Sequence, residues 1–450
     1  MAVARETANP RSGADPRYLN FKDELHRVVV DVADLSRIDR WSRDRLRLEV
    51  HDLGRKLAPQ VDRRLPAADV DRAVDEVVDE VFGLGPLEPL LADLTVTEVL
   101  VNAPDQVYVE RGGTLRRVDV TFTDKAHLTR VIQRIASRVG RRVDESSPMV
   151  DARLPDGSRV NAVLPPLTLD SPVLSIRRFG EGFTADQFIR LHSSTPEMMH
   201  FLETAIAAKM NTLISGGTGA GKTTLLNVLS AYIPRGERLV TIEDAAELKL
   251  QQPHVVRMET RTANLEGAGS VSQRDLLRNA LRMRPDRIIL GECRGPEAVD
   301  MLQAMNTGHE GSLTTVHAND TRDALGRLEL MIGLAGVNLE VHVLRGYIAN
   351  AFNLLVHVSR LAGGQRKITR ISELVGLRQG KIYRVRDIFV FEQTGVVNGH
   401  AVGAFKATGY VPRVLARLEA AGRPLPEKLF AARDLEHIGP PANAGGGDDA

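Results

Sequence analysis

Residues 216–223 read Gly-Gly-Thr-Gly-Ala-Gly-Lys-Thr and match the pattern G-x-x-x-x-G-K-[ST] at every fixed position. An apolar stretch, residues 212–215, precedes this loop, and an amphipathic stretch follows it, so the pattern lies between a predicted strand and a predicted helix. A loop that turns its amide groups toward one anion needs glycine, because a Cβ would hinder both the backbone conformation and the approach to phosphate. The stretch therefore predicts a phosphate-binding loop in an α/β fold.

The residue types in and after this loop indicate ATP with Mg²⁺ as the ligand. Lys222 would place a positive charge at the β and γ phosphates, and Thr223 would offer a hydroxyl to the metal. The helix that starts here would direct its positive dipole end at the phosphates. The residues predicted to hold the nucleotide are Gly216, Gly217, Thr218, Gly219, Ala220, Gly221, Lys222, Thr223 and Thr224.

Strands and helices alternate on the carboxyl-terminal side of the loop, which predicts a mainly parallel sheet flanked by helices. On the amino-terminal side, apolar residues recur at helical spacing up to residue 82, and from Val96 the period changes to two. We therefore expect a helical segment and a mixed α/β domain, followed by a P-loop core that includes carboxyl-terminal strands and a helix. The expected ranges are a tail at 1–17, the helical segment at 18–85, the mixed domain at 86–190, the core at 191–436 and a tail at 437–450.

Two predicted strands beyond the loop each end in a carboxylate. LVTIED puts Glu243 at its exit, and RIILGE puts Glu292 after an apolar run. Ligands of open α/β sheets bind beyond the carboxyl ends of the strands, so both residues are predicted to face the nucleotide. We predict that they position the attacking water and, for Glu292 together with Thr223, hold Mg²⁺ directly or through water. The alternative is a pair of solvated carboxylates; Asp286 precedes its strand and is interpreted as structural.

Two histidines bracket a further predicted strand, residues 312–317. His309 precedes this strand and His317 ends it. Beside a nucleotide they could sense the terminal phosphate through hydrogen bonds and pass its loss to neighbouring elements. A structural role for each imidazole is the alternative.

Composition sets broader limits on the class of protein. The 450 residues are enough for two or three domains, and 43% apolar with 26% charged residues is ordinary globular composition. The 59 basic and 58 acidic residues nearly cancel, so nucleic acid is an unlikely partner. The one cysteine, Cys293, cannot form an internal disulfide, which suits a reducing compartment. No apolar run approaches the length of a membrane span, so we expect a cytosolic protein that meets membranes through partners.

The motifs occur in a fixed order, and the set resembles the secretion ATPases of type II and type IV secretion and type IV pilus systems. Four stretches correspond to the Walker A, Asp box, atypical Walker B and His box of that family. They are GGTGAGKTT (216–224), TIEDAAEL (241–248), RMRPDRIILGECRG (282–295) and MNTGHEGSLTTVHAND (305–320). The flanks agree, and the resemblance is closest to the CpaF subfamily, the ATPases of tight-adherence (Flp) pilus assembly.

The resemblance also implies a fold, an oligomeric state, a location and partners for the protein. It implies a RecA-like core and a homohexameric motor in the cytoplasm, peripheral at the inner face of the cytoplasmic membrane, with inner-membrane platform proteins as partners. Arginines of the amino-terminal domain reach the γ-phosphate in this family, and the matching segments are DGSRV and LSIRRF. Arg159 and Arg177 are therefore expected as arginine fingers, with Arg178 as the alternate to Arg177, because strand alternation presents only one of the two on a given face.

Other functions use the same phosphate loop. An ATPase of conjugation or type IV secretion would move effectors or DNA instead of assembling a pilus and possibly retracting it. A small-molecule kinase would need an acceptor pocket, and a nucleotide-gated scaffold would not need the paired glutamates. The paired glutamates and the four ordered motifs favour a hydrolysing motor.

Overall fold

The computed structural model of the chain describes residues 15–32, 43–178, 183–261, 269–336 and 339–439. The chain divides into two compact units, residues 1–180 and 181–450. This division lies ahead of the boundary expected near residue 190. The reason is that residues after 183 pack in the second unit: Phe188 belongs to its core, and Ser193 accepts a backbone hydrogen bond from Ile368 at 2.8 Å.

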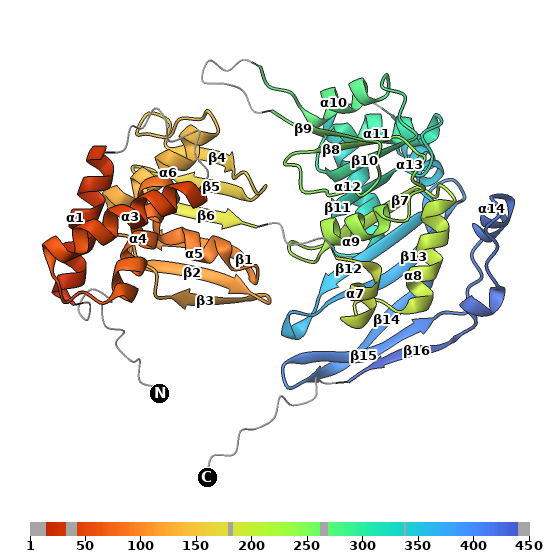
Figure 1. Cartoon of the computed structure of the whole chain (residues 1–450). Helices are drawn as coiled ribbons and strands as arrows, with labels where there is room; N and C mark the ends of the chain where they lie inside the picture. The colour runs from red at the N-terminus through yellow and green to blue at the C-terminus, as the bar shows by residue number, and fades with distance from the viewer. Residues whose placement is uncertain (1–14, 33–42, 179–182, 262–268, 337–338, 440–450) are drawn as a thin grey trace, which may run out of the picture. The chain divides into compact units, whose positions relative to one another are not determined.

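The first unit begins with helices whose apolar faces form a core of their own, as the helical spacing predicts (Figure 1). Phe21 and Leu25 of the first helix and Val74 and Val77 of the third are among the buried residues of this core. The helices are α1 (Pro16–Val32), α3 (Arg43–Val61) and α4 (Ala67–Phe82).

The rest of the first unit is a sheet covered by one long helix. The described strands form a six-stranded antiparallel sheet in the order β3-β2-β1-β6-β5-β4. Its core lies between the sheet and α6, where Val99 and Ile176 meet Leu128 and Ile132. The elements are η2 (Gly85–Leu87), α5 (Glu88–Ala92), β1 (Val96–Ala103), β2 (Gln106–Arg111), β3 (Thr114–Val118), α6 (Lys125–Arg138), β4 (Met149–Arg153), β5 (Arg159–Val163) and β6 (Val173–Arg177).

The second unit is built on one large sheet. Its described strands number ten, in the order β16-β15-β14-β13-β12-β7-β11-β10-β8-β9. The six strands from β12 to β9 pair in parallel, which confirms the predicted parallel core. The strands are β7 (Thr212–Gly216), β8 (Leu239–Glu243), β9 (Val255–Glu259), β10 (Arg287–Cys293), β11 (Leu313–His317) and β12 (Leu354–Arg360).

The carboxyl-terminal strands extend this sheet by antiparallel pairing and do not form a separate one. β13 pairs with β12 across a tight connection, so the sheet continues directly beside the strand next to the phosphate loop. These elements are η3 (Ala362–Gly364), β13 (Arg366–Arg378), β14 (Ile382–Val397), β15 (His400–Ala407), α14 (Leu415–Ala420), η4 (Glu427–Phe430) and β16 (Arg433–Ile438).

Helices cover both faces of the parallel part of the sheet and define two cores. On one face Leu225 and Leu229 of α9 pack with residues of α8, and on the other face Leu325 and Leu328 of α12 pack with α11 and α13. The two groups are visible around the sheet in Figure 1. The helices are α7 (Ala185–Arg190), α8 (Pro196–Ala207), α9 (Lys222–Ser230), α10 (Gln273–Ala280), α11 (Glu297–Asn306), α12 (Thr321–Leu334) and α13 (Val341–Ala351).

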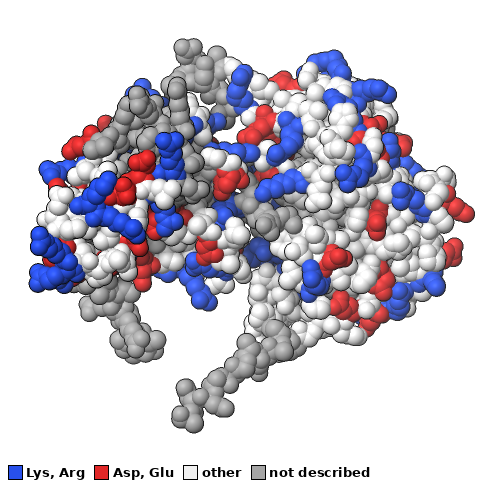
Figure 2. Space-filling view, viewed as in Figure 1, with Lys and Arg blue, Asp and Glu red and all other residues white. Residues whose placement is uncertain are grey.

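Two surface properties bear on the partners of the chain. Among the described residues, no helix combines the length and the apolar character that crossing a bilayer requires. On the face drawn in Figure 2, basic and acidic side chains are interspersed, in keeping with the near balance of 59 basic and 58 acidic residues.

Candidate nucleotide site

The predicted phosphate loop runs from the end of β7 to the start of α9. Gly219 and Gly221 have φ angles of 68° and 98°, a region that residues with a Cβ rarely adopt. Gly221 directly precedes α9, so the first amide groups of that helix, which have no partners within it, are presented by the loop. This is the local geometry with which a helix start binds phosphate.

Side chains from two elements fix the loop. Lys222 Nζ donates to the Gly217 carbonyl oxygen at 3.1 Å, so the ammonium group is folded back over the loop. Arg366, the first residue of β13, donates from Nε to the Gly219 carbonyl oxygen at 2.9 Å. The carboxyl-terminal strands therefore help to hold the phosphate loop, a contact that the sequence pattern did not predict.

Glu243 ends β8 and is buried, with 3% of its surface exposed. Its Oε1 accepts hydrogen bonds from the backbone N–H groups of Glu247 at 2.8 Å and Leu248 at 2.9 Å. Its Oε2 has no hydrogen-bond partner among the described residues. Burial raises the pKa of Glu243 to about 7 and outweighs the two backbone hydrogen bonds, which lower it. A carboxyl group in this state can accept a proton near neutral pH.

Glu292 lies near the end of β10 and is held differently. Its Oε2 accepts from Arg294 at 2.7 Å, and the same guanidinium reaches Asp244 Oδ2 at 3.4 Å. The hydrogen bond from Arg294 to Glu292 raises the pKa of the guanidinium. Strands β8 and β10 are paired, with Ile242 opposite Leu290, so the two glutamates end neighbouring strands at one edge of the sheet.

The two predicted histidines lie at opposite ends of β11. His317 is paired in register with Gly216, the first residue of the phosphate loop. His309 lies before β11, at the amino-terminal end of the strand, where Leu313 pairs with Thr212. Four steps of about 3.3 Å separate the two ends of the strand, roughly 13 Å. His317 therefore lies beside the loop and His309 lies beyond the other end of the strand, and the sensing role of the two histidines stays a prediction.

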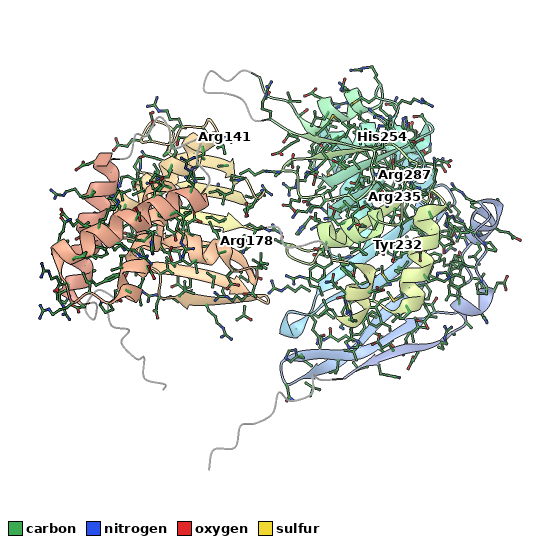
Figure 3. All side chains as sticks on the ribbon, viewed as in Figure 1. Arg141, Arg178, Tyr232, Arg235, His254 and Arg287 are labelled. Carbon is green, nitrogen blue, oxygen red and sulfur yellow. The ribbon has the colours of Figure 1, made fainter. Side chains whose placement is uncertain are left out.

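The predicted arginine fingers lie in the first unit, in one cross-strand row. Arg159 of β5 is paired with Arg177 of β6, and Arg177 also makes a 3.8 Å ion pair with Glu98 of β1. Arg178, labelled in Figure 3, donates instead to the backbone carbonyl oxygens of Asp93 and Val96. The guanidinium of Arg178 therefore stabilises the backbone of the first unit. By contrast, 54% of the Arg177 side chain is exposed.

The residues at the sheet edge fit Mg²⁺ bound together with a nucleotide. Among the described residues, no group of three or more His, Cys, Asp and Glu side chains could hold a metal. Mg²⁺ in ATPase sites needs no such group, because one or two carboxylates and the substrate phosphates hold it. The Glu292 carboxylate, whose side chain is 24% exposed near the end of β10, matches this donor chemistry.

Two residues that shape the site, Gly291 and Arg294, lie outside the site residues predicted from the sequence motifs. Gly291 leaves room for Glu243: a Cβ at this position would lie 2.9 Å from Glu243 Cγ. Arg294 neutralises Glu292, as described above. Glycine directly before a strand-end glutamate, and arginine two residues after it, were visible signals in the segment 291–294.

The comparisons with known proteins identify the family of the chain. The model of the type II/IV secretion system protein family matches residues 80–371, and the chain belongs to that family. A Mycobacterium tuberculosis protein named for conjugal transfer is 42% identical over 310 residues, 67% of this chain and 86% of that protein. VirB11 of the Brucella suis type IV secretion system is 33% identical over 317 residues, 64% of this chain and 88% of that protein. A crystal structure of the Brucella suis VirB11 ATPase covers 64% of this chain and 94% of its own at 31% identity, with a TM-score of 0.36.

Proposed function

We propose that this protein hydrolyses ATP to ADP and phosphate, with ATP and Mg²⁺ held at the phosphate loop. The observation that supports this most is the position of Glu243 and Glu292, which end two paired strands of the sheet that also carries the loop. Membership of the type II/IV secretion system protein family supports it independently.

The nucleotide would be bound by the loop and the first turn of α9. The backbone N–H groups of residues 216–224 would surround the phosphates, and Lys222 would leave the Gly217 carbonyl for the β and γ phosphates. Thr223, with Glu292 directly or through water, would complete the surroundings of Mg²⁺, which draws charge from the terminal phosphate.

Glu243 is the residue that we assign to the attacking water. Water forms a bond to the γ-phosphorus, the bond to the bridging oxygen of ADP breaks, and Glu243 accepts a proton from the water. The raised pKa of Glu243, about 7, suits a group that takes up and returns a proton near neutral pH. His317, next to Gly216 in register, is the residue that we assign to sensing the terminal phosphate.

Arg159 and Arg177 are the arginines that we assign to the terminal phosphate, and the commitment of Arg178 to backbone carbonyls favours Arg177 over it. An arginine finger acts on the charge of the transition state. Arg159→Ala should therefore lower turnover by about 10³ or more while sparing ATP affinity. Unchanged turnover would refute the role.

At the level of the cell, we propose a homohexameric motor, cytoplasmic and peripheral at the inner face of the cytoplasmic membrane, that powers assembly of a tight-adherence (Flp) pilus through inner-membrane platform proteins. The flanking stretches 85–111 and 153–166, which resemble the CpaF subfamily, support this assignment. The second candidate is an ATPase of conjugation or type IV secretion. The names of the relatives at 42% and 33% identity favour that alternative.

A steady-state ATPase assay of the full chain tests the hydrolysis. Lys222→Ala and Glu243→Ala should each abolish most phosphate production, and near-normal turnover in both variants would contradict the proposal. Native mass with and without ATP and Mg²⁺ tests the hexamer.

Cells that lack the protein distinguish the two biological roles. Loss of surface pili, restored by the unaltered gene and not by the Glu243→Gln variant, supports the pilus motor. Normal pili with a defect in transfer of DNA or effectors supports the alternative. ATP turnover that DNA stimulates with a steep salt dependence would point to a nucleic-acid cargo.

A further inference from the structure

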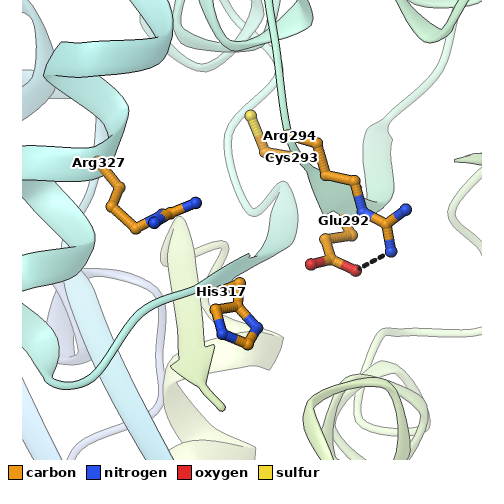
Figure 4. A pocket seen from close by; sticks show the side chains of 5 residues that line it. All are labelled: Glu292, Cys293, Arg294, His317 and Arg327. Atoms are coloured by element: carbon orange, nitrogen blue, oxygen red, sulfur yellow. Dashed lines mark hydrogen bonds and ion pairs between the residues drawn. The ribbon is translucent and has the colours of Figure 1, made fainter. Parts of the chain in front are cut away.

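A pocket of about 350 Å³ opens at the carboxyl ends of β10 and β11, and it includes Glu292 and His317 of the candidate nucleotide site (Figure 4). Two strands and one helix of the second unit contribute to it. Its lining residues are Glu292, Cys293, Arg294, His317 and Arg327. Figure 4 shows Arg327 extending from its helix toward the space between His317 and Glu292, with Arg294 on the far side of Glu292.

The charged groups of the pocket have an excess of positive charge. Two guanidinium groups, those of Arg294 and Arg327, face one carboxylate, that of Glu292, and the His317 imidazole adds a polar group. Arg294 is paired with Glu292 and Asp244. Within the part of the chain that the structure describes, the guanidinium of Arg327 has neither a hydrogen bond nor an ion pair. An uncommitted arginine in a concave, positively charged pocket is suited to an anion.

The pocket lies at the edge of the sheet where the phosphate loop begins. His317, which lines the pocket, is the register partner of Gly216, and β10 is the next strand after β11. Neighbouring strands are about 4.8 Å apart, so β10 is roughly 10 Å from the strand that carries the loop. A phosphate released from a nucleotide on the loop would therefore need to move by only one or two strand spacings to reach the pocket.

We propose that this pocket binds the inorganic phosphate that hydrolysis releases, and that Arg327 is its principal ligand. The proposal rests on the proposed ATPase function. The planar fork of arginine matches two phosphate oxygens, and a charged hydrogen bond of this kind is among the stronger polar contacts in proteins. His317 would donate a further hydrogen bond, and Arg294 would exchange Glu292 for the phosphate. The pocket would thus hold the product apart from the loop before it leaves.

Equilibrium dialysis of the full-length, nucleotide-free protein with radioactive inorganic phosphate tests the site without turnover. Arg327→Ala should weaken phosphate binding by about tenfold or more, the loss expected for one charged hydrogen-bonding partner. The matched control is Arg322→Ala, which removes an exposed arginine of the same helix that does not line the pocket. This control should bind phosphate within about twofold of the unaltered chain.

Phosphate binding by the Lys222→Ala variant distinguishes the two places where phosphate could bind, the pocket and the phosphate loop. Retained binding in this variant, with loss in Arg327→Ala, supports the pocket. Loss in Lys222→Ala with normal binding in Arg327→Ala would place the phosphate on the loop and overturn the proposal, as would no measurable binding by the unaltered chain. Arg327→Lys keeps the charge without the fork and should recover only part of the affinity.

Product inhibition provides the second measurement. Added inorganic phosphate should inhibit ATP turnover of the unaltered chain, and the inhibition constant should rise about tenfold in Arg327→Ala but not in Arg322→Ala. An unchanged inhibition constant in Arg327→Ala would overturn the proposal that the pocket binds the released phosphate. Absence of any turnover by the unaltered chain contradicts the ATPase function instead, and the dialysis result then still decides whether the pocket binds phosphate.

Discussion

Glu243 at the end of β8 and Glu292 near the end of β10 are the two acidic residues of the candidate site. Their surroundings differ in burial and in charge. Glu243 is 3% exposed, and its Oε1 accepts from the backbone N–H groups of Glu247 and Leu248 in the loop that follows β8. The Glu292 side chain is 24% exposed and paired with a guanidinium. Burial favours the protonated form of the Glu243 carboxyl group, whereas Arg294 places a guanidinium beside the Glu292 carboxylate. Two similar strand ends thereby acquire different chemistry from their surroundings.

The largest expected effect comes from removing the proton acceptor. Glu243→Gln should lower ATP turnover by about 10² to 10⁴, the usual contribution of a general acid–base group, because the amide cannot take up a proton. Turnover and ATP affinity of the full chain are the measurements. Asp244→Asn, the adjacent exposed carboxylate, serves as control and should change turnover by less than about threefold. Equal losses in both variants would remove the distinction drawn for Glu243.

The pH dependence of stability tests the same carboxyl group without catalysis. The pKa of Glu243 is raised from the ordinary 4.5 to about 7 by burial, so the folded state binds the proton more tightly than the unfolded state. The resulting stability is complete below pH 4.5 and is lost as the pH rises through about 7. At about 1.4 kcal/mol per pH unit this amounts to about 3 kcal/mol or less.

Denaturant unfolding at several pH values measures this effect. The free energy of unfolding of Glu243→Gln, relative to the unaltered chain, should rise between pH 4.5 and about 7. Glu292→Gln is the matched substitution at the neighbouring strand end and removes an ion pair with Arg294 worth about 0–1 kcal/mol. Parallel curves for the unaltered chain and Glu243→Gln would contradict the raised pKa.

Glu292→Gln tests whether the second glutamate acts through Mg²⁺. If Glu292 supports Mg²⁺ through water, its loss should lower turnover by about 10- to 100-fold and raise the Mg²⁺ concentration for half-maximal activity. Turnover titrated with Mg²⁺ at saturating ATP gives both values. Glu243→Gln should leave the Mg²⁺ requirement near normal. A shift of the requirement in Glu243→Gln and none in Glu292→Gln would reverse the two assignments.

We predict the smallest loss of turnover for a substitution of Gly291, the glycine that leaves room for Glu243. Gly291→Ala would place a Cβ 2.9 Å from Glu243 Cγ, so the Glu243 side chain must move. We expect turnover to fall by about tenfold, since small displacements at a catalytic group are costly. Gly236→Ala, at a position with open space around the added Cβ, is the control and should keep normal turnover.

The phosphate loop and the class of the fold could both be predicted from the order of residue types. The loop could be predicted because its glycines, Lys222 and Thr223 are contiguous, and contiguous residues share one local conformation. The parallel core followed from the alternation of strands and helices. The strand-end positions of Glu243, Glu292 and His317 followed as well, because parallel strands present their carboxyl ends at one edge.

The surroundings of these residues come from packing, much of it between segments that are far apart in the sequence. That Glu243 is buried, that Arg294 pairs with Glu292, that Arg366 reaches Gly219 and that Arg327 lines the pocket all depend on contacts between segments or on backbone placement that residue type does not fix. His309 illustrates the same limit: the sequence puts His309 and His317 on either side of a strand, and the packed sheet decides which end of that strand lies beside the phosphate loop. The burial of a side chain and the charged groups around it depend on how the chain packs. A sequence motif predicts them only where residues that are adjacent in the sequence are also adjacent in space.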